Sequence, residues 1–139
     1  MADLDIARLL WGYAYFKRVV MLRGLVQFFD SIGIRSQSDL EAWASKADFE
    51  KDFKGRAPNL AFAAFKWLVK RMGVDTIKPD VHVLAFVEAT LGFPLSDTEA
   101  VASLERVARD LGIRAAQLDA TIWTYQRALA STIVFKKPS

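Results

Sequence analysis

The chain contains no cysteine and a single histidine, His82, among its 139 residues. The lack of cysteine excludes disulfides, cysteine-based zinc sites and cysteine-ligated iron–sulfur clusters. One histidine also excludes a metal site built from several histidines, so we expect neither a metal nor a cofactor. No apolar run reaches ~18 residues without a charge, which argues against a membrane span. Acids occupy the first residues where a secretory signal would be basic, so we expect a cytoplasmic protein.

Hydrophobic residues are plentiful, at 53% of the chain, and 12% of the residues are aromatic. This composition supplies a large core and indicates one folded domain, which we place at residues 1–133 with a tail at 134–139. Apolar residues recur with helical spacing, and no convincing alternation typical of a strand appears. The sequence therefore predicts an all-α fold, a compact helical domain of about 7–8 helices.

Glycines mark several expected helix boundaries. The segment from Leu4 to about Ser31 is predicted to form one long helix or two, with Gly12 and Gly24 as its weak points. Gly33 then suits a left-handed cap that ends the segment. The last helix is expected to span about residues 114–131.

Serines mark the expected starts of two other helices. Ser36 or Ser38 can cap a short helix, and Ser38 with Glu41 three residues later fits a capping box. Ser96 with Glu99 has the same spacing and predicts a second capped helix. These are local signals, because each needs only residues within one helical turn.

A basic turn, Lys54-Gly55-Arg56-Ala57-Pro58, links two expected helical segments. Pro58 suits the first turn of a helix, so we expect a helix from Pro58 to Gly73. Such a turn can leave successive backbone N–H groups pointing outward beside a helix N-terminus, which makes an anion site. Lys54 and Arg56 would add positive charge. The structural alternative is an ordinary helical hairpin without a ligand.

Asp80 follows a loop that begins at Gly73. Pro79 keeps Lys78 out of the α region, which places Asp80 at the N-cap or first position of a helix. A fixed carboxylate there could stabilise a cationic sugar when an N-glycosidic bond breaks, and it could position or activate water. The structural alternative is a simple cap, worth about 1 kcal/mol. Asp75 is a rival acid in the same loop, which we expect to be solvated.

Charge is unevenly distributed, although the net value is only +3. Two acids, Asp75 and Asp80, stand in the segment 54–80 against six bases: Lys54, Arg56, Lys66, Lys70, Arg71 and Lys78. A basic zone of this kind suits an anionic partner. The alternative is a set of solvated helix faces.

The turn, the following helix and the loop ending in Asp80 together resemble the helix-hairpin-helix Gly/Pro-Asp DNA glycosylase superfamily, over roughly residues 45–130. The Asp-x-His that often follows in that family reads Asp80-Val81-His82. The segment Leu118–Tyr125 is similar to the family's C-terminal helix, where Asp119 and Trp123 are expected to be structural. The resemblance implies a helix-hairpin-helix motif in a DNA-binding protein of base-excision-repair type.

The resemblance also implies roles for individual residues. Asp80 would be the catalytic carboxylate, with His82 and Lys78 supporting it. Contacts to the backbone of duplex DNA would come from the turn and the residue after it: Lys54, Gly55, Arg56, Ala57, Pro58 and Asn59.

The sequence departs from the family pattern at three points, and one of them excludes lyase activity from the expected function. Ala57 stands where the family usually has a second glycine. Asn59 stands where members with lyase activity carry a lysine, and asparagine cannot form a Schiff base, so we expect a monofunctional DNA N-glycosylase. The segment before the turn is also shorter than the family's usual N-terminal lobe.

Two other function classes stay open on the sequence. One is a non-catalytic helix-hairpin-helix module that only binds DNA. The other is a helical protein-interaction domain in which Asp80 is no more than a cap. A short N-terminal lobe would also leave apolar surface uncovered, which is compatible with a homodimer.

Overall fold

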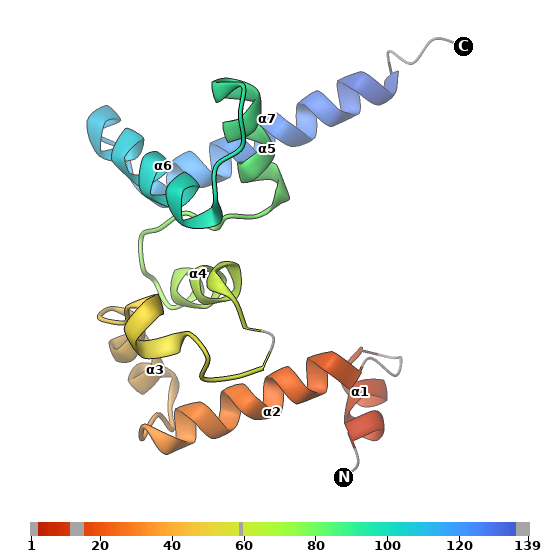
Figure 1. Cartoon of the computed structure of the whole chain (residues 1–139), viewed down its shortest axis with the longest axis vertical. Coiled ribbons are helices and arrows are strands. Elements are labelled where there is room, and N and C mark those ends of the chain that lie inside the picture. Colours follow the sequence, from red (N-terminus) through yellow and green to blue (C-terminus); the bar gives the residue numbers. More distant parts are fainter. Residues whose placement is uncertain (1–2, 12–15, 59, 136–139) are drawn as a thin grey trace. The chain divides into compact units, whose positions relative to one another are not determined.

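The computed structural model describes residues 3–11, 16–58 and 60–135. Within these ranges every regular element is helical and no strand occurs, which confirms the prediction of an all-α fold of about 7–8 helices. The elements, shown in Figure 1, are α1 Asp3–Trp11, α2 Phe16–Ser31, α3 Gln37–Ala44, the π-helical turn η1 Phe49–Phe53, α4 Phe62–Arg71, α5 Val81–Leu91, α6 Asp97–Leu111 and α7 Ala115–Phe135.

The chain divides into two compact units, Met1–Phe65 and Lys66–Ser139, and the division falls within α4. The single domain expected at residues 1–133 stays a prediction. Helix α7 continues to Phe135, two residues into the segment expected as a tail.

Aromatic side chains form the core of the first unit. The ring of Phe53, which is 1% exposed, lies with its centroid 5.3 Å from that of Phe65. Trp43 of α3 stands edge-on to Phe28 of α2, at 6.3 Å between centroids, and edge-on to Phe65 at the same distance. Such edge-to-face pairs add to the free energy that burial alone provides. They join α2, α3 and η1 to the start of α4.

Two helices, and not one, form the first segment. Gly12, one of the two expected weak points, lies outside the described residues. Gly24, the other, lies inside the continuous helix α2. Glycine is needed at this position because a larger residue would not fit. A Cβ built on Gly24 would lie 2.7 Å from Cδ of Pro58 and 3.3 Å from Cβ of Ala57. The missing side chain thus allows the turn after η1 to pack directly on α2.

The helix expected to start at Pro58 starts instead at Phe62, so that expectation was wrong. Ala57 is buried at Gly24, and Pro58 touches the same point of α2. This packing fixes the chain in a non-helical path, and the first backbone hydrogen bond of α4 runs from Phe65 N to Ala61 O. The connection from η1 to α4 therefore spans residues 54–61.

Ser36, and not Ser38, caps α3. The Ser36 hydroxyl accepts a hydrogen bond from Asp39 N at 3.1 Å, while Ser38 lies within the helix. The expected box of Ser38 with Glu41 is therefore wrong. Asp39 is the acid that lies three residues after the cap Ser36. Its carboxylate accepts a hydrogen bond from Arg35 N at 3.0 Å. Ser36 and Asp39 therefore stabilise the start of α3 in the manner of a capping box, two residues before the predicted pair.

Helices α5, α6 and α7 pack against one another in the second unit. Ser96 and Glu99 form the predicted capping box at the start of α6. The left-handed Gly112 ends α6, and Gly33 takes the left-handed conformation predicted for it after α2. The core residues of this unit are Val69, Ile77, Val83, Val87, Ala100, Val101, Leu104, Ala108, Ala115 and Ile122.

We predict that Gly24→Ala destabilises the protein. In most helix interiors this change stabilises by about 1 kcal/mol, but the added methyl at Gly24 meets the rigid ring of Pro58 and should cost about 1–3 kcal/mol. Urea denaturation of Gly24→Ala, Pro58→Ala and the double variant measures the effect. The double variant should recover part of the loss, with a coupling of about 1 kcal/mol. Purely additive effects would contradict the close packing.

Candidate active site at the start of helix α5

Asp80 is the N-cap of α5, as predicted. Its Oδ1 accepts hydrogen bonds from His82 N and Val83 N, each at 3.0 Å. Backbone dihedrals of φ −86° and ψ 178° place Asp80 in the extended conformation that an N-cap requires. Within the described part of the chain, Oδ2 accepts no hydrogen bond. The carboxylate is therefore fixed through one oxygen and has the other available.

A buried carboxylate, Asp119 of α7, holds the loop just before Asp80. Asp119 is 4% exposed, and its Oδ2 accepts from Lys70 Nζ at 2.5 Å and from Lys78 N at 2.9 Å. The contact with Lys70 is an ion pair, which compensates the charge of the buried acid. The bond to Lys78 N fixes the backbone two residues before Asp80. The expectation that Asp119 is structural agrees with this geometry.

Asp75 fixes the other end of the same loop. It is exposed, as expected, yet Oδ2 accepts from Ala115 N at 3.0 Å and Oδ1 from Ala116 N at 2.9 Å. Asp75 thus caps α7 from a distant part of the sequence. The pKa of the Asp75 carboxyl is lowered, chiefly by the hydrogen bond from Ala116 N. The hydrogen bond from Ala115 N and the positive charges of Arg114 and Lys70 lower this pKa to a smaller extent. Slight burial acts in the opposite direction.

The middle of the loop is buried. Thr76 is 1% exposed, and its hydroxyl donates to Glu105 Oε1 at 2.5 Å and accepts from Lys66 Nζ at 3.1 Å. Lys66 also lies 3.8 Å from the same Glu105 oxygen. Ile77 next to Thr76 has no exposed surface. Side chains of α4, α6 and α7 therefore anchor the loop that leads to Asp80.

Asp80 borders an open concavity of about 450 Å³ in the second unit. Its wall is formed by Lys70, Lys78, Asp80, Asp119, Ala120, Trp123 and Thr124. Trp123 stands edge-on to the His82 ring at 6.0 Å between centroids, and the Arg127 guanidinium lies 4.6 Å from the Trp123 ring centroid. The concavity thus combines two carboxylates, two ammonium groups and an aromatic wall.

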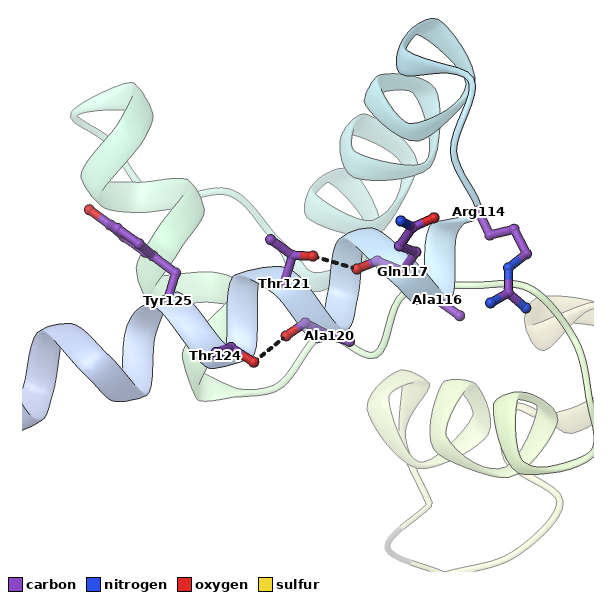
Figure 2. Close-up of a pocket in the computed structure, with 7 residues that line it drawn as sticks. All are labelled: Arg114, Ala116, Gln117, Ala120, Thr121, Thr124 and Tyr125. Atoms are coloured by element: carbon purple, nitrogen blue, oxygen red, sulfur yellow. Dashed lines mark hydrogen bonds between the residues drawn. The ribbon is translucent and has the colours of Figure 1, made fainter.

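A second concavity lies along one face of α7, as Figure 2 shows. Ala120 and Thr124 border both concavities, so the two adjoin. The hydroxyls of Thr121 and Thr124 donate to the carbonyls of Gln117 and Ala120, each at 2.9 Å, and so serve the helix itself. Arg114 is the charged residue of this wall.

The turn expected to bind DNA lies in the first unit, and its geometry differs from that of an open anion site. Lys54 N donates to Phe49 O at 2.8 Å, and Arg56 N donates to Phe53 O at 3.0 Å. Two of the N–H groups expected to point outward are therefore used within the turn. Asn59, the last of the expected DNA-binding residues, lies outside the described residues.

The predicted basic zone is partly neutralised. Lys54 Nζ pairs with Glu50 at 3.0 Å, and Lys70 pairs with Asp119. Arg71 lies over the ring of Trp67, with its guanidinium carbon 4.6 Å from the centroid. In the described ranges no group of three or more His, Asp or Glu side chains could hold a metal ion. Nor does any helix there have the length and apolarity to cross a membrane.

Fold and site together define an all-helical protein with an anchored carboxylate at a helix start. The chain belongs to the family described as Domain of unknown function (DUF8548), which matches residues 16–127. The match covers both the turn at 54–58 and Asp80. No curated protein and no solved structure matches the chain.

Sequence reasoning located Asp80 but missed how its loop is held. Asp75 and Asp119 act on backbone N–H groups about forty positions away in the sequence. No local spacing marks such a contact. The one available signal was Asp119 itself, an acid among the apolar residues of the last helix.

We predict that Asp119→Ala destabilises the protein by about 2–3 kcal/mol, because it leaves Lys70 and the Lys78 N–H without their shared acceptor. Urea denaturation measures the loss. Asp110→Ala is the matched control, since Asp110 is an exposed acid near the end of α6 and its removal should change stability by less than about 0.5 kcal/mol. Equal effects of the two variants would show that Asp119 anchors nothing.

Acid should weaken the cap on α7. The folded protein holds the pKa of Asp75 below its ordinary value, so it binds fewer protons than the unfolded chain as the pH falls. The stabilisation is complete above the unfolded pKa of about 3.9 and is lost as the pH drops through the lower folded value. The urea midpoint of Asp75→Asn should therefore fall less than that of the wild type between neutral pH and about pH 3. Identical acid dependence in the two proteins would contradict this role.

Proposed function

We propose that this protein binds DNA and hydrolyses the N-glycosidic bond of a damaged or modified base, with Asp80 as the catalytic carboxylate. The observation that carries the proposal is the arrangement of Asp80, which lines a concavity, has Oδ1 fixed by two backbone N–H groups, and accepts no hydrogen bond at Oδ2 within the described residues. The resemblance of the Pro79-Asp80-Val81-His82 corner to the helix-hairpin-helix glycosylases supports the same assignment.

Cleavage of an N-glycosidic bond develops positive charge on the sugar. A carboxylate that is already oriented stabilises this charge without reorganisation, and the same oxygen can orient the attacking water. Anchoring by Asp119 and Asp75 limits the movement of the corner, which keeps Asp80 in place. The cap and the chemistry are compatible, because they use different oxygens of one carboxylate.

The other groups of the concavity have complementary chemistry. Lys78 brings positive charge that suits a phosphate flanking a target nucleotide, whereas the charge of Lys70 is compensated by Asp119. Trp123 offers an aromatic surface, and stacking of a base on such a ring contributes about 1–3 kcal/mol. The ring of His82 contacts Trp123 and so orders this wall. A lyase step is not part of the proposal, since Asn59 stands where a Schiff-base lysine would be needed.

A non-catalytic DNA-binding module is the second candidate. It is favoured by the two capping bonds of Asp80, which by themselves account for an acid at this position. Under this alternative, removing the charge of Asp80 would leave every function of the protein unchanged, provided that the cap is kept.

We therefore predict that Asp80→Asn abolishes base release while the fold is kept, because asparagine also caps helices well. Oligonucleotides carrying uracil, hypoxanthine, alkylated purines, 8-oxoguanine or mismatched adenine are incubated with the protein and then treated with hot alkali. Cleavage at one lesion should fall by about 10²–10³-fold in Asp80→Asn. Asp110→Asn, the matched exposed acid, should keep full activity. Full activity in Asp80→Asn would refute the catalytic role.

A further inference from the structure

A third concavity lies in the first unit, between α2 and the turn after η1. Its volume is about 650 Å³, within the range of small-ligand sites. Arg23, Gln27 and Ser31 line it from α2, and Gly55, Arg56 and Pro58 line it from the turn. The turn residues belong to the segment that the sequence predicts to contact DNA, whereas the residues of α2 are part of no predicted site.

Gly24 brings these two walls together. It lies beside Arg23 in α2 and is the point at which Ala57 and Pro58 touch the helix. A side chain at Gly24 would separate the turn from α2, since its Cβ would lie 2.7 Å from Cδ of Pro58. The glycine thus places Arg23 and Arg56 on one concave surface.

The donors of this surface suit a phosphate. Its lining residues include two guanidinium groups and an amide, and no carboxylate, while the Ser31 hydroxyl already donates to Phe28 O at 2.6 Å. A guanidinium has five N–H donors in a planar fork that matches phosphate oxygens. Arg56 uses one of its nitrogens, Nη2, toward Lys51 O at 3.4 Å, which orients the side chain and leaves further donors. Gly55 has a φ of 74°, a left-handed conformation that lets the backbone approach a ligand closely.

We propose that this concavity binds a phosphate of the DNA backbone, with Arg23 and Gln27 of α2 completing the site that the turn begins. The inference rests on the proposed DNA binding and adds a helix to the contact surface. Phosphate contacts of this kind position a duplex without reading its sequence. An open concavity with exposed arginines suits a phosphate that belongs to a long strand.

The experiment measures binding of the full chain to a fluorescein-labelled undamaged DNA duplex by fluorescence anisotropy at several salt concentrations. Arg23→Glu should weaken binding by about tenfold or more at moderate salt, and Arg23→Gln should reduce the salt slope by about 1. Lys17→Glu is the matched control, because Lys17 is exposed on the same helix and does not line the concavity. Its affinity should change by less than about twofold.

Each outcome has a distinct meaning. Circular dichroism melting of each variant shows whether it folds, and the milder Arg23→Gln replaces Arg23→Glu if the latter does not. If Arg23→Glu and Lys17→Glu weaken binding equally, only net charge matters and the site is refuted. If Arg56→Glu weakens binding but neither Arg23 variant does, the turn binds DNA without α2 and the inference alone fails.

A competing occupant and the failure of DNA binding are also separable. If Arg23→Glu leaves duplex binding intact but removes a rise in melting temperature caused by pyrophosphate, the occupant is a small phosphate and the DNA assignment is overturned. If the wild type binds no duplex at low salt, the proposed function fails together with the inference.

Discussion

The hydrogen bond from the backbone of Lys78 to the buried carboxylate of Asp119 is the contact on which the candidate site depends. Lys78 precedes Pro79, whose fixed φ leaves the chain little freedom before the cap at Asp80. Fixing the Lys78 N–H therefore fixes the direction in which α5 begins. The ion pair with Lys70 offsets the cost of burying the charge of Asp119, because an acid as buried as Asp119 needs a compensating cation.

The loop and helix α7 stabilise each other reciprocally. Asp75 of the loop satisfies the free N–H groups at the start of α7, and Asp119 of α7 satisfies a free N–H group of the loop. Asp75 thus replaces a cap that the local sequence lacks, since the residue before α7 is Arg114 rather than a capping residue. Disturbing either acid should loosen both segments, which makes the position of Asp80 a property of the whole second unit.

Local chemistry was predictable from the sequence, and long-range chemistry was not. Asp80, Ser96, Glu99 and Gly33 act within one helical turn of themselves, so their types and spacing were enough. The helix start predicted at Pro58 is wrong because the rule for proline at a helix start considers only local sequence. Pro58 instead packs against Gly24 of another helix. The prediction that Gly24 is a weak point of a helix is wrong for the same reason. A glycine needed for close packing and a glycine that breaks a helix look alike in one sequence.

A cap and a catalytic carboxylate are often weighed as rival explanations of one acid, yet at Asp80 the observed cap is compatible with the proposed catalytic role. Two N–H groups bound to Oδ1 hold the carboxylate in one orientation. A carboxylate prepared in this way stabilises a developing cation better than a mobile one, because no reorganisation is needed when the charge appears. The cap thus explains where Asp80 lies, and the proposed function depends on Oδ2. Replacement by asparagine separates the two, because it keeps the acceptor that the helix uses and removes the charge that a reaction would use.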